Sequence, residues 1–102
     1  MISDDVLRSV AFVKRGKNRR KVLEAVEQPG LPSEIVVAIY GKSSESFFAT
    51  VSRALSELEE KNIIELLNPE ERTGRTYRLT PLGKAVLSYL HRERSRKEII
   101  SR

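Results

Sequence analysis

Short hydroxyl side chains, a methyl group and a guanidinium recur at helical spacing between residues 46 and 53. The candidate residues of this outward face are Ser46, Ala49, Thr50 and Arg53. An arginine can donate two hydrogen bonds to a guanine edge, and the methyl groups of alanine and threonine can contact the thymine methyl group. For Glu45 two interpretations stay open, an acceptor for cytosine or a carboxylate that stabilises the start of a helix. The face therefore has the chemistry needed to read base edges.

Positive charge gathers in three other segments. The run from 14 to 21 holds six positive charges in eight residues, enough to neutralise several phosphates if they lie on one side. The loop near residues 72–75 could deliver a guanidinium to a narrow minor groove. The candidate residues are Lys17, Arg19 and Arg20 in the run, Lys42 and Ser44 in the turn before the long helix, and Arg72, Thr73 and Arg75 in the loop. The competing interpretation is that these charges only keep the surface solvated.

The sequence lacks the residues that catalysis, metal binding or nucleotide binding would need. The absence of cysteine excludes disulfides, thiolate metal sites and cysteine nucleophiles. His91 is the only histidine, so neither a multi-histidine metal site nor a Ser-His-Asp triad is expected. Gly41-Lys42-Ser43 resembles the end of a phosphate-binding loop, but Val36 stands where that motif needs its first glycine. We therefore expect no enzyme, no metal and no cofactor.

Composition favours an anionic partner. The 102 residues fit one domain, and their 39% hydrophobic content is typical of a folded protein. A net charge of +5 and a sequence pI of 9.8 indicate nucleic acid first and a membrane surface second. The sequence contains no apolar run long enough to span a membrane and no signal peptide, so a cytoplasmic location is expected.

Local signals predict the elements that position these residues. A first helix is expected over about 4–15 behind a Ser3 cap, and a second follows Gly16, either separate from the first or continuous with it. A short helix should run from Pro32 to about Tyr40. A long helix should begin near residue 45 and end near 62, with an apolar stripe of Phe48, Val51, Leu55 and Leu58.

The neighbouring aromatic residues Phe47 and Phe48 leave two possibilities. Either both lie in the core, which is favoured by how often large apolar residues are buried, or one touches thymine methyl groups or a partner. After the long helix, the runs 63–67 and 75–79 predict a hairpin around the loop 68–74. Thr80 should cap a last helix that starts at Pro81 and reaches about 98.

This order of elements resembles the winged helix-turn-helix regulators of archaea and bacteria, of the MarR-like and ArsR-like kind. The segments that carry the resemblance are Ser33-Glu34-Ile35, Val51-Ser52-Arg53-Ala54-Leu55, Ile63-Ile64 and Arg75 through Gly83, within about 21–90. The resemblance implies a mainly α fold with a small β-hairpin (α+β), in which a three-helix core carries a wing and flanking terminal helices. It also implies that 45–61 enters the major groove of DNA while the loop 68–74 lies beside the backbone or minor groove.

We therefore expect a single winged-helix domain over 1–102, with its core at about 17–90, that binds double-stranded DNA as a sequence-preferring transcription regulator. The terminal helices, about 4–15 and 81–98, are expected to form a homodimer, because their apolar residues offer more surface than one small core absorbs. Those residues are Val6, Val10, Val13, Leu82, Val86, Tyr89 and Leu90. A protein-docking module and a nonspecific architectural DNA-binding protein remain the alternatives.

Overall fold

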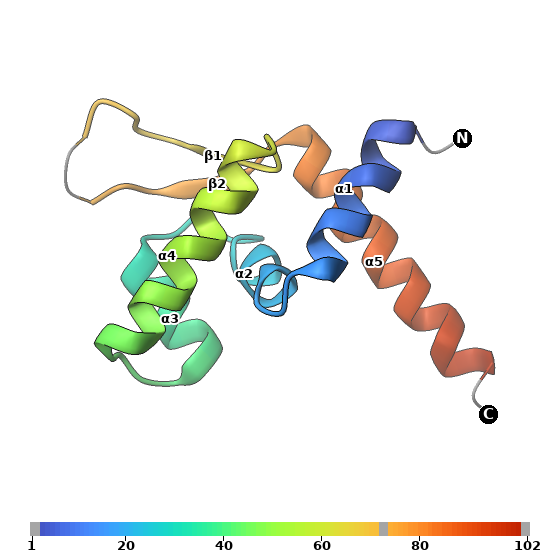
Figure 1. Ribbon diagram of the computed structural model, residues 1–102, viewed down its shortest axis with the longest axis horizontal. Helices are drawn as coiled ribbons and strands as arrows, with labels where there is room; N and C mark the ends of the chain where they lie inside the picture. Colours follow the sequence, from blue (N-terminus) through green and yellow to red (C-terminus); the bar gives the residue numbers. More distant parts are fainter. Residues whose placement is uncertain (1–2, 72–73, 101–102) are drawn as a thin grey trace.

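The structure, a computed structural model, describes residues 3–71 and 74–100 of the chain, and only the backbone of 97–100. The elements in these residues are α1 (Asp4–Arg15), α2 (Arg19–Ala25), α3 (Pro32–Tyr40), α4 (Glu45–Glu60), β1 (Ile64–Leu66), β2 (Tyr77–Leu79) and α5 (Pro81–Ile100) (Figure 1). The predicted fold is confirmed: a winged helix-turn-helix in which α2, α3 and α4 carry a hairpin wing, with one further helix at each end.

The first two helices are separate. The Ser3 hydroxyl accepts a hydrogen bond from the Val6 N–H at 3.3 Å, and two acidic residues occupy the first turn of α1. Gly16 ends that helix in an extended conformation, and α2 begins three residues later. Of the two arrangements that the sequence left open, the break is the observed one.

α3 begins and ends where its local signals predict. Pro32 occupies the first position, and the Glu34 carboxylate accepts a hydrogen bond from the backbone N–H of Leu31 at 2.8 Å. Gly41 ends the helix with a φ of 77°, a left-handed conformation that costs little only without a Cβ. This residue turns the chain from α3 into the segment that leads to α4.

The hairpin is a short antiparallel ladder. Ile64 pairs with Leu79 and Leu66 pairs with Tyr77. Gly30, in the connection between α2 and α3, exchanges two backbone hydrogen bonds with Tyr77 at 3.0 and 3.1 Å. The wing is therefore attached to the helical body through the first residue of β2.

The joint between the hairpin and α5 is closely packed. The Thr80 hydroxyl accepts a hydrogen bond from the Gly83 N–H at 3.0 Å, and it lies 2.8 and 2.9 Å from the carbonyl oxygens of Asn62 and Ile63. A Cβ atom on Gly83 would lie only 2.1 Å from the Ile63 carbonyl oxygen. The first turn of α5 thus packs directly on the backbone that follows α4.

One hydrophobic core joins every helix to the hairpin. The largest side chains that are almost fully buried are Val13, Val22, Leu23, Val26, Ile35, Val36, Val51, Leu55, Leu58, Ile63, Ile64 and Leu90. Full burial of an aliphatic side chain of this size contributes about 1.5–3 kcal/mol relative to exposure, so packing holds the fold without a disulfide.

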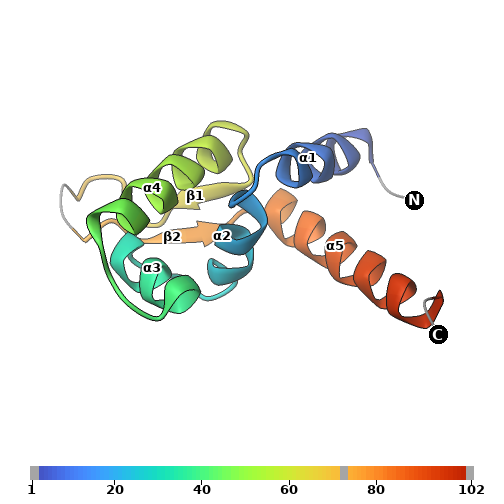
Figure 2. The ribbon, with the colours of Figure 1, turned by 60° about the horizontal axis from the view of Figure 1, so that its bottom comes forward.

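α1 and α5 pack on each other, at the opposite end of the molecule from the wing loop (Figures 1 and 2). Val10 and Val13 of α1 and Val86 and Leu90 of α5 are at most 5% exposed within a single chain. The prediction that these side chains remain available to a partner is therefore wrong, because the two terminal helices cover each other. Leu7, which is 43% exposed, is the large apolar residue that α1 leaves uncovered.

Candidate nucleic-acid interface

The first turns of α4 present a polar outer face. The Ser44 hydroxyl accepts a hydrogen bond from the Phe47 N–H at 3.1 Å and so begins the helix. Ser46, Ala49 and Arg53 are exposed, and their spacing of three and four residues places them on one side of the helix. Within the described residues the Arg53 guanidinium has neither a hydrogen bond nor an ion pair. This side of α4 combines small side chains with one free guanidinium.

Two further candidates flank that face. Lys42 is exposed in the turn before α4, two residues ahead of the helix cap. Thr50 is half-buried, and its hydroxyl donates a hydrogen bond to the Ser46 carbonyl at 3.0 Å. Lys42 and Ser44 therefore lie at the positive end of the α4 dipole, whereas Thr50 offers its methyl group and a free lone pair at the edge of the face.

Phe48 is the clearest correction to the sequence prediction. The expected core stripe included it, but its side chain is 44% exposed. Its neighbour Phe47 is half-buried instead and stacks on Tyr40 of α3, with ring centroids 4.1 Å apart and planes 5° apart. Adjacent residues of an α-helix point in directions about 100° apart, so the turn of α4 that packs Phe47 on Tyr40 leaves Phe48 outside. The favoured interpretation that both rings are buried is thus wrong.

The basic run divides into three kinds of environment. Lys17 is exposed in the turn between α1 and α2. Arg20 forms an ion pair with Glu24, one turn further along the same helix, at 3.1 Å. Arg19 points into the fold, and its side chain is only 17% exposed. Of these three candidates, only Lys17 presents a charge that no described carboxylate pairs with.

Arg19 ties α1 to α4. Its guanidinium donates to the Phe12 carbonyl at 2.7 Å and to both carboxylate oxygens of Glu57 at 3.2 Å each. The guanidinium carbon also lies 3.8 Å from the centroid of the Phe12 ring. The hydrogen bond from Arg19 lowers the pKa of Glu57, and the nearby charge of Arg53 adds to the effect. Arg19 is thus a structural residue in this fold.

The wing is closed at its base by Asn68. The side chain of Asn68 donates to the Gly74 carbonyl at 3.0 Å and accepts from the Thr76 N–H at 2.9 Å. Arg75 is exposed next to this clasp. The candidates Arg72 and Thr73 lie outside the described residues. Sequence reasoning missed the clasp, although an asparagine at the start of a turn is its usual local signal.

The side chain of Tyr77, the first residue of β2, is buried. Tyr77 is 8% exposed, and this burial raises the pKa of its phenol, with the negative charge of Glu59 acting in the same direction. The phenol is therefore neutral at physiological pH. Tyr77 supports the wing and adds no charge to the candidate interface.

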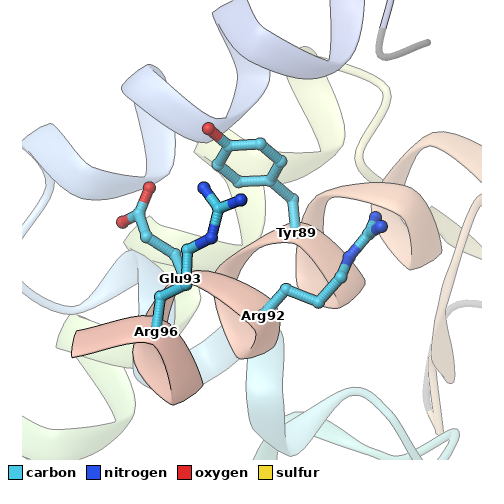
Figure 3. Close-up of a pocket in the computed structure, with 4 residues that line it drawn as sticks. All are labelled: Tyr89, Arg92, Glu93 and Arg96. Carbon is cyan, nitrogen blue, oxygen red and sulfur yellow. The ribbon is translucent and has the colours of Figure 1, made fainter. Parts of the chain in front are cut away.

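A hollow of about 200 Å³ lies along α5 (Figure 3). It is lined by Tyr89, Arg92, Glu93 and Arg96, and Glu93 forms an ion pair with Lys14 of α1. The residues that the structure describes contain no group of three or more His, Asp or Glu side chains placed to hold a metal ion. No helix within 3–71 and 74–100 is long and apolar enough to cross a membrane.

A solved structure shares this fold. The chain superposes on the crystal structure of a MarR family transcription regulator with a TM-score of 0.73 and 23% sequence identity, over 93% of this chain. The chain spans 62% of the length of that regulator. The sequence matches no protein-family model and no curated protein at a significant level. The similarity establishes the winged helix-turn-helix fold.

Proposed function

We propose that the protein binds double-stranded DNA as a transcription regulator, with α4 in the major groove and the wing on the backbone or minor groove. The observation that carries the proposal is the outer face of α4, where a free Arg53 guanidinium stands beside the small side chains of Ser46 and Ala49. A major groove about 12 Å wide admits a helix, and small residues let its backbone approach the bases. The similarity to the fold of a MarR family regulator supports the same role.

The contacts divide into two kinds. Arg53, Ala49 and Ser46 are assigned to base edges, with Thr50 at the border of that face. The residues assigned to phosphates are Lys17, Lys42, Ser44 and Arg75, together with Arg72 and Thr73 from the sequence prediction. Arg19 is left out because its donors are engaged within the fold, and Arg20 is secondary because Glu24 already neutralises it.

Homodimerisation forms part of the proposal on a narrower basis than the sequence indicated. Most of the described apolar side chains of α1 and α5 are buried or half-buried within the chain, but Leu7 remains exposed. A two-fold pair would place two α4 helices about one DNA turn apart, about 10 bp, or a multiple of it. Sedimentation at micromolar concentration tests this, because a monomer both alone and on DNA would contradict it.

The test of DNA binding is selection of bound sequences from random duplexes at near-physiological salt, followed by salt titrations of variants. Arg53→Ala should cost about 1–3 kcal/mol on the selected duplex and relax the preference at one base pair. Arg75→Ala should weaken selected and scrambled duplexes alike. It should also reduce the slope of log affinity against log salt by about one for each phosphate that the variant no longer neutralises.

Lys84→Ala is the matched control, since Lys84 is an exposed cation on α5, an element to which no DNA contact is assigned. Affinity of this variant should equal that of the wild type. If Arg53→Ala weakens both duplexes equally, the base-reading assignment is wrong. Enrichment of no sequence despite tight binding would favour an architectural protein, and absence of binding would favour a protein-docking module.

A further inference from the structure

A second hollow, of about 330 Å³, lies between α1 and the residue that ends α4. Its lining residues are Arg8, Ser9, Phe12, Arg15 and Lys61. The α1 members Arg8, Phe12 and Arg15 are spaced by four and three residues and therefore share one side of the helix. Lys61 caps the C-terminal end of α4. Two elements distant in the sequence thus direct three cationic side chains at one space.

The charge of this hollow is not balanced by the protein. In the part of the chain that the structure describes, Arg8, Arg15 and Lys61 have no carboxylate within ion-pair distance. The carboxylate of Glu57, one turn before Lys61 on α4, is bound on both oxygens by Arg19. Like charges that converge without a counter-charge repel one another, and an anion between them removes that repulsion.

The lining also supplies groups that would orient an anion. The guanidiniums of Arg8 and Arg15 can each grip two oxygens of one carboxylate or phosphate group. Ser9, which is only 9% exposed, adds a hydroxyl donor. The Phe12 ring is held in place by Arg19 at 3.8 Å and lies 5.5 Å from the Lys61 ammonium, so it forms a fixed apolar wall. The volume falls at the lower end of the range for small-ligand pockets.

We propose that this hollow binds a small anion with two or more oxyanion groups, such as a diphosphate or a polycarboxylate. The site is separate from the base-reading face of α4 and from the wing, whereas Lys17, one of the residues assigned to phosphates, follows Arg15 by only two positions. Each residue of α4 rises about 1.5 Å, and Lys61 follows Ser44 by 17 positions, so the two lie about 26 Å apart along the helix. In addition, α1 and the wing loop lie at opposite ends of the molecule (Figure 1). The inference does not depend on the proposed function.

Pyrophosphate and citrate are suitable probes, with sodium chloride and acetate at the same ionic strength as controls. Isothermal titration should give one saturable site per chain for each probe, with a dissociation constant below about 1 mM, and no site for acetate. The same probes should raise the melting temperature, because a ligand that binds only the native state stabilises it. Failure of both probes to saturate below about 10 mM would refute the proposal.

Variants of the lining test the geometry. Arg8→Gln and Arg15→Gln should each weaken pyrophosphate binding about tenfold, as expected when a charged hydrogen-bonding partner is removed. Both side chains are exposed, so neither change should alter the circular dichroism spectrum or the melting temperature without ligand. Arg15→Lys should recover only part of the affinity, because the ammonium keeps the charge but lacks the two-pronged geometry.

Arg94→Gln is the matched control, since it removes the same charge from an exposed position on α5 outside the hollow. If it weakens binding as much as Arg15→Gln does, the probes respond only to net charge and the site assignment is wrong. A DNA duplex provides a second discriminating arm. If saturating duplex excludes pyrophosphate in the wild type, the hollow belongs to the surface that contacts DNA phosphates, and the proposal of a separate anion site is overturned. If both bind together, the site is independent of DNA.

Discussion

Replacement of Arg19 by methionine tests the connection between α1 and α4 most directly. Methionine keeps an unbranched apolar stem beside Phe12 but removes every donor. The change eliminates the hydrogen bond to the Phe12 carbonyl, the cation–π interaction with its ring and the paired hydrogen bonds to Glu57. All three depend on one guanidinium, so their contributions are not independent.

The expected decrease in stability follows from how far each interaction is removed from water. A charged hydrogen bond contributes about 1.5–3 kcal/mol, and a cation–π interaction contributes about 0.5–2 kcal/mol. The pair with Glu57 adds at most about 1 kcal/mol, because the Glu57 side chain is 38% exposed and water screens it. Allowing for the sulfur–aromatic interaction of methionine, we expect Arg19→Met to cost about 2–3 kcal/mol.

The pH dependence separates the contributions. The pKa of Glu57 is lowered in the folded protein, so its pairing stabilises the fold above the unfolded pKa and is lost as pH falls through the folded value. The difference in unfolding free energy between wild type and Arg19→Met should therefore narrow in acid. It should not vanish, because the interactions of Arg19 with Phe12 do not titrate. Glu57→Gln should cost less than Arg19→Met at neutral pH.

Urea unfolding followed by circular dichroism at neutral and acid pH gives these free energies. Arg15→Met is the control, because Arg15 is exposed and its replacement should change stability by no more than about 0.5 kcal/mol. The reasoning fails if Arg19→Met lies within about 0.5 kcal/mol of the wild type. It also fails if Glu57→Gln costs as much, since the ion pair would then carry the effect.

Three other substitutions have defined outcomes. Gly83→Ala should lower the free energy of unfolding by about 1–3 kcal/mol in a thermal melt, because the clash at 2.1 Å with the Ile63 carbonyl outweighs the better helix propensity of alanine. A gain in melting temperature would contradict this packing. Thr80→Val should cost about 1–2 kcal/mol through removal of the α5 cap, and an unchanged melting temperature would show that the cap is dispensable. Phe48→Ala should cost less than about 1 kcal/mol, whereas a core position such as Leu55 should cost about 2–5 kcal/mol on the same change. Equal costs for the Phe48 and Leu55 substitutions would mean that the Phe48 ring is buried in the core.

The sequence predicts the element boundaries well because their signals are local. Ser44 and Thr80 supply caps at three residues' distance, and Gly41 supplies the left-handed turn. For the neighbouring aromatic residues the stripe predicts a buried Phe48, whereas Phe47 is the ring that packs inward, because the choice depends on Tyr40 from another helix. The position of a helix boundary is set by neighbouring residues, whereas the burial of a side chain depends on the packing of the whole chain.

The basic run shows the same limit for the candidate site. In the sequence, Lys17, Arg19 and Arg20 are equivalent members of one charged segment. The structure separates them, because the partner of Arg19 is Glu57, which lies 38 residues away. No local pattern marks such a pair. The base-reading assignments on α4 follow from helical spacing, and they remain predictions until DNA binding is measured.

The clasp at Asn68 has a consequence for how this protein could diversify. Asn68 joins Gly74 and Thr76 below the tip, so the hydrogen bonds of the β1–β2 ladder do not depend on the residues within the loop. Lengthening a loop closed in this way is inexpensive, since each doubling of its length costs only about 0.6 kcal/mol of closure entropy. Surface loops of this kind are also where insertions are best tolerated. Related chains could therefore acquire new tip sequences, and new binding partners, while the body of the fold stays unchanged.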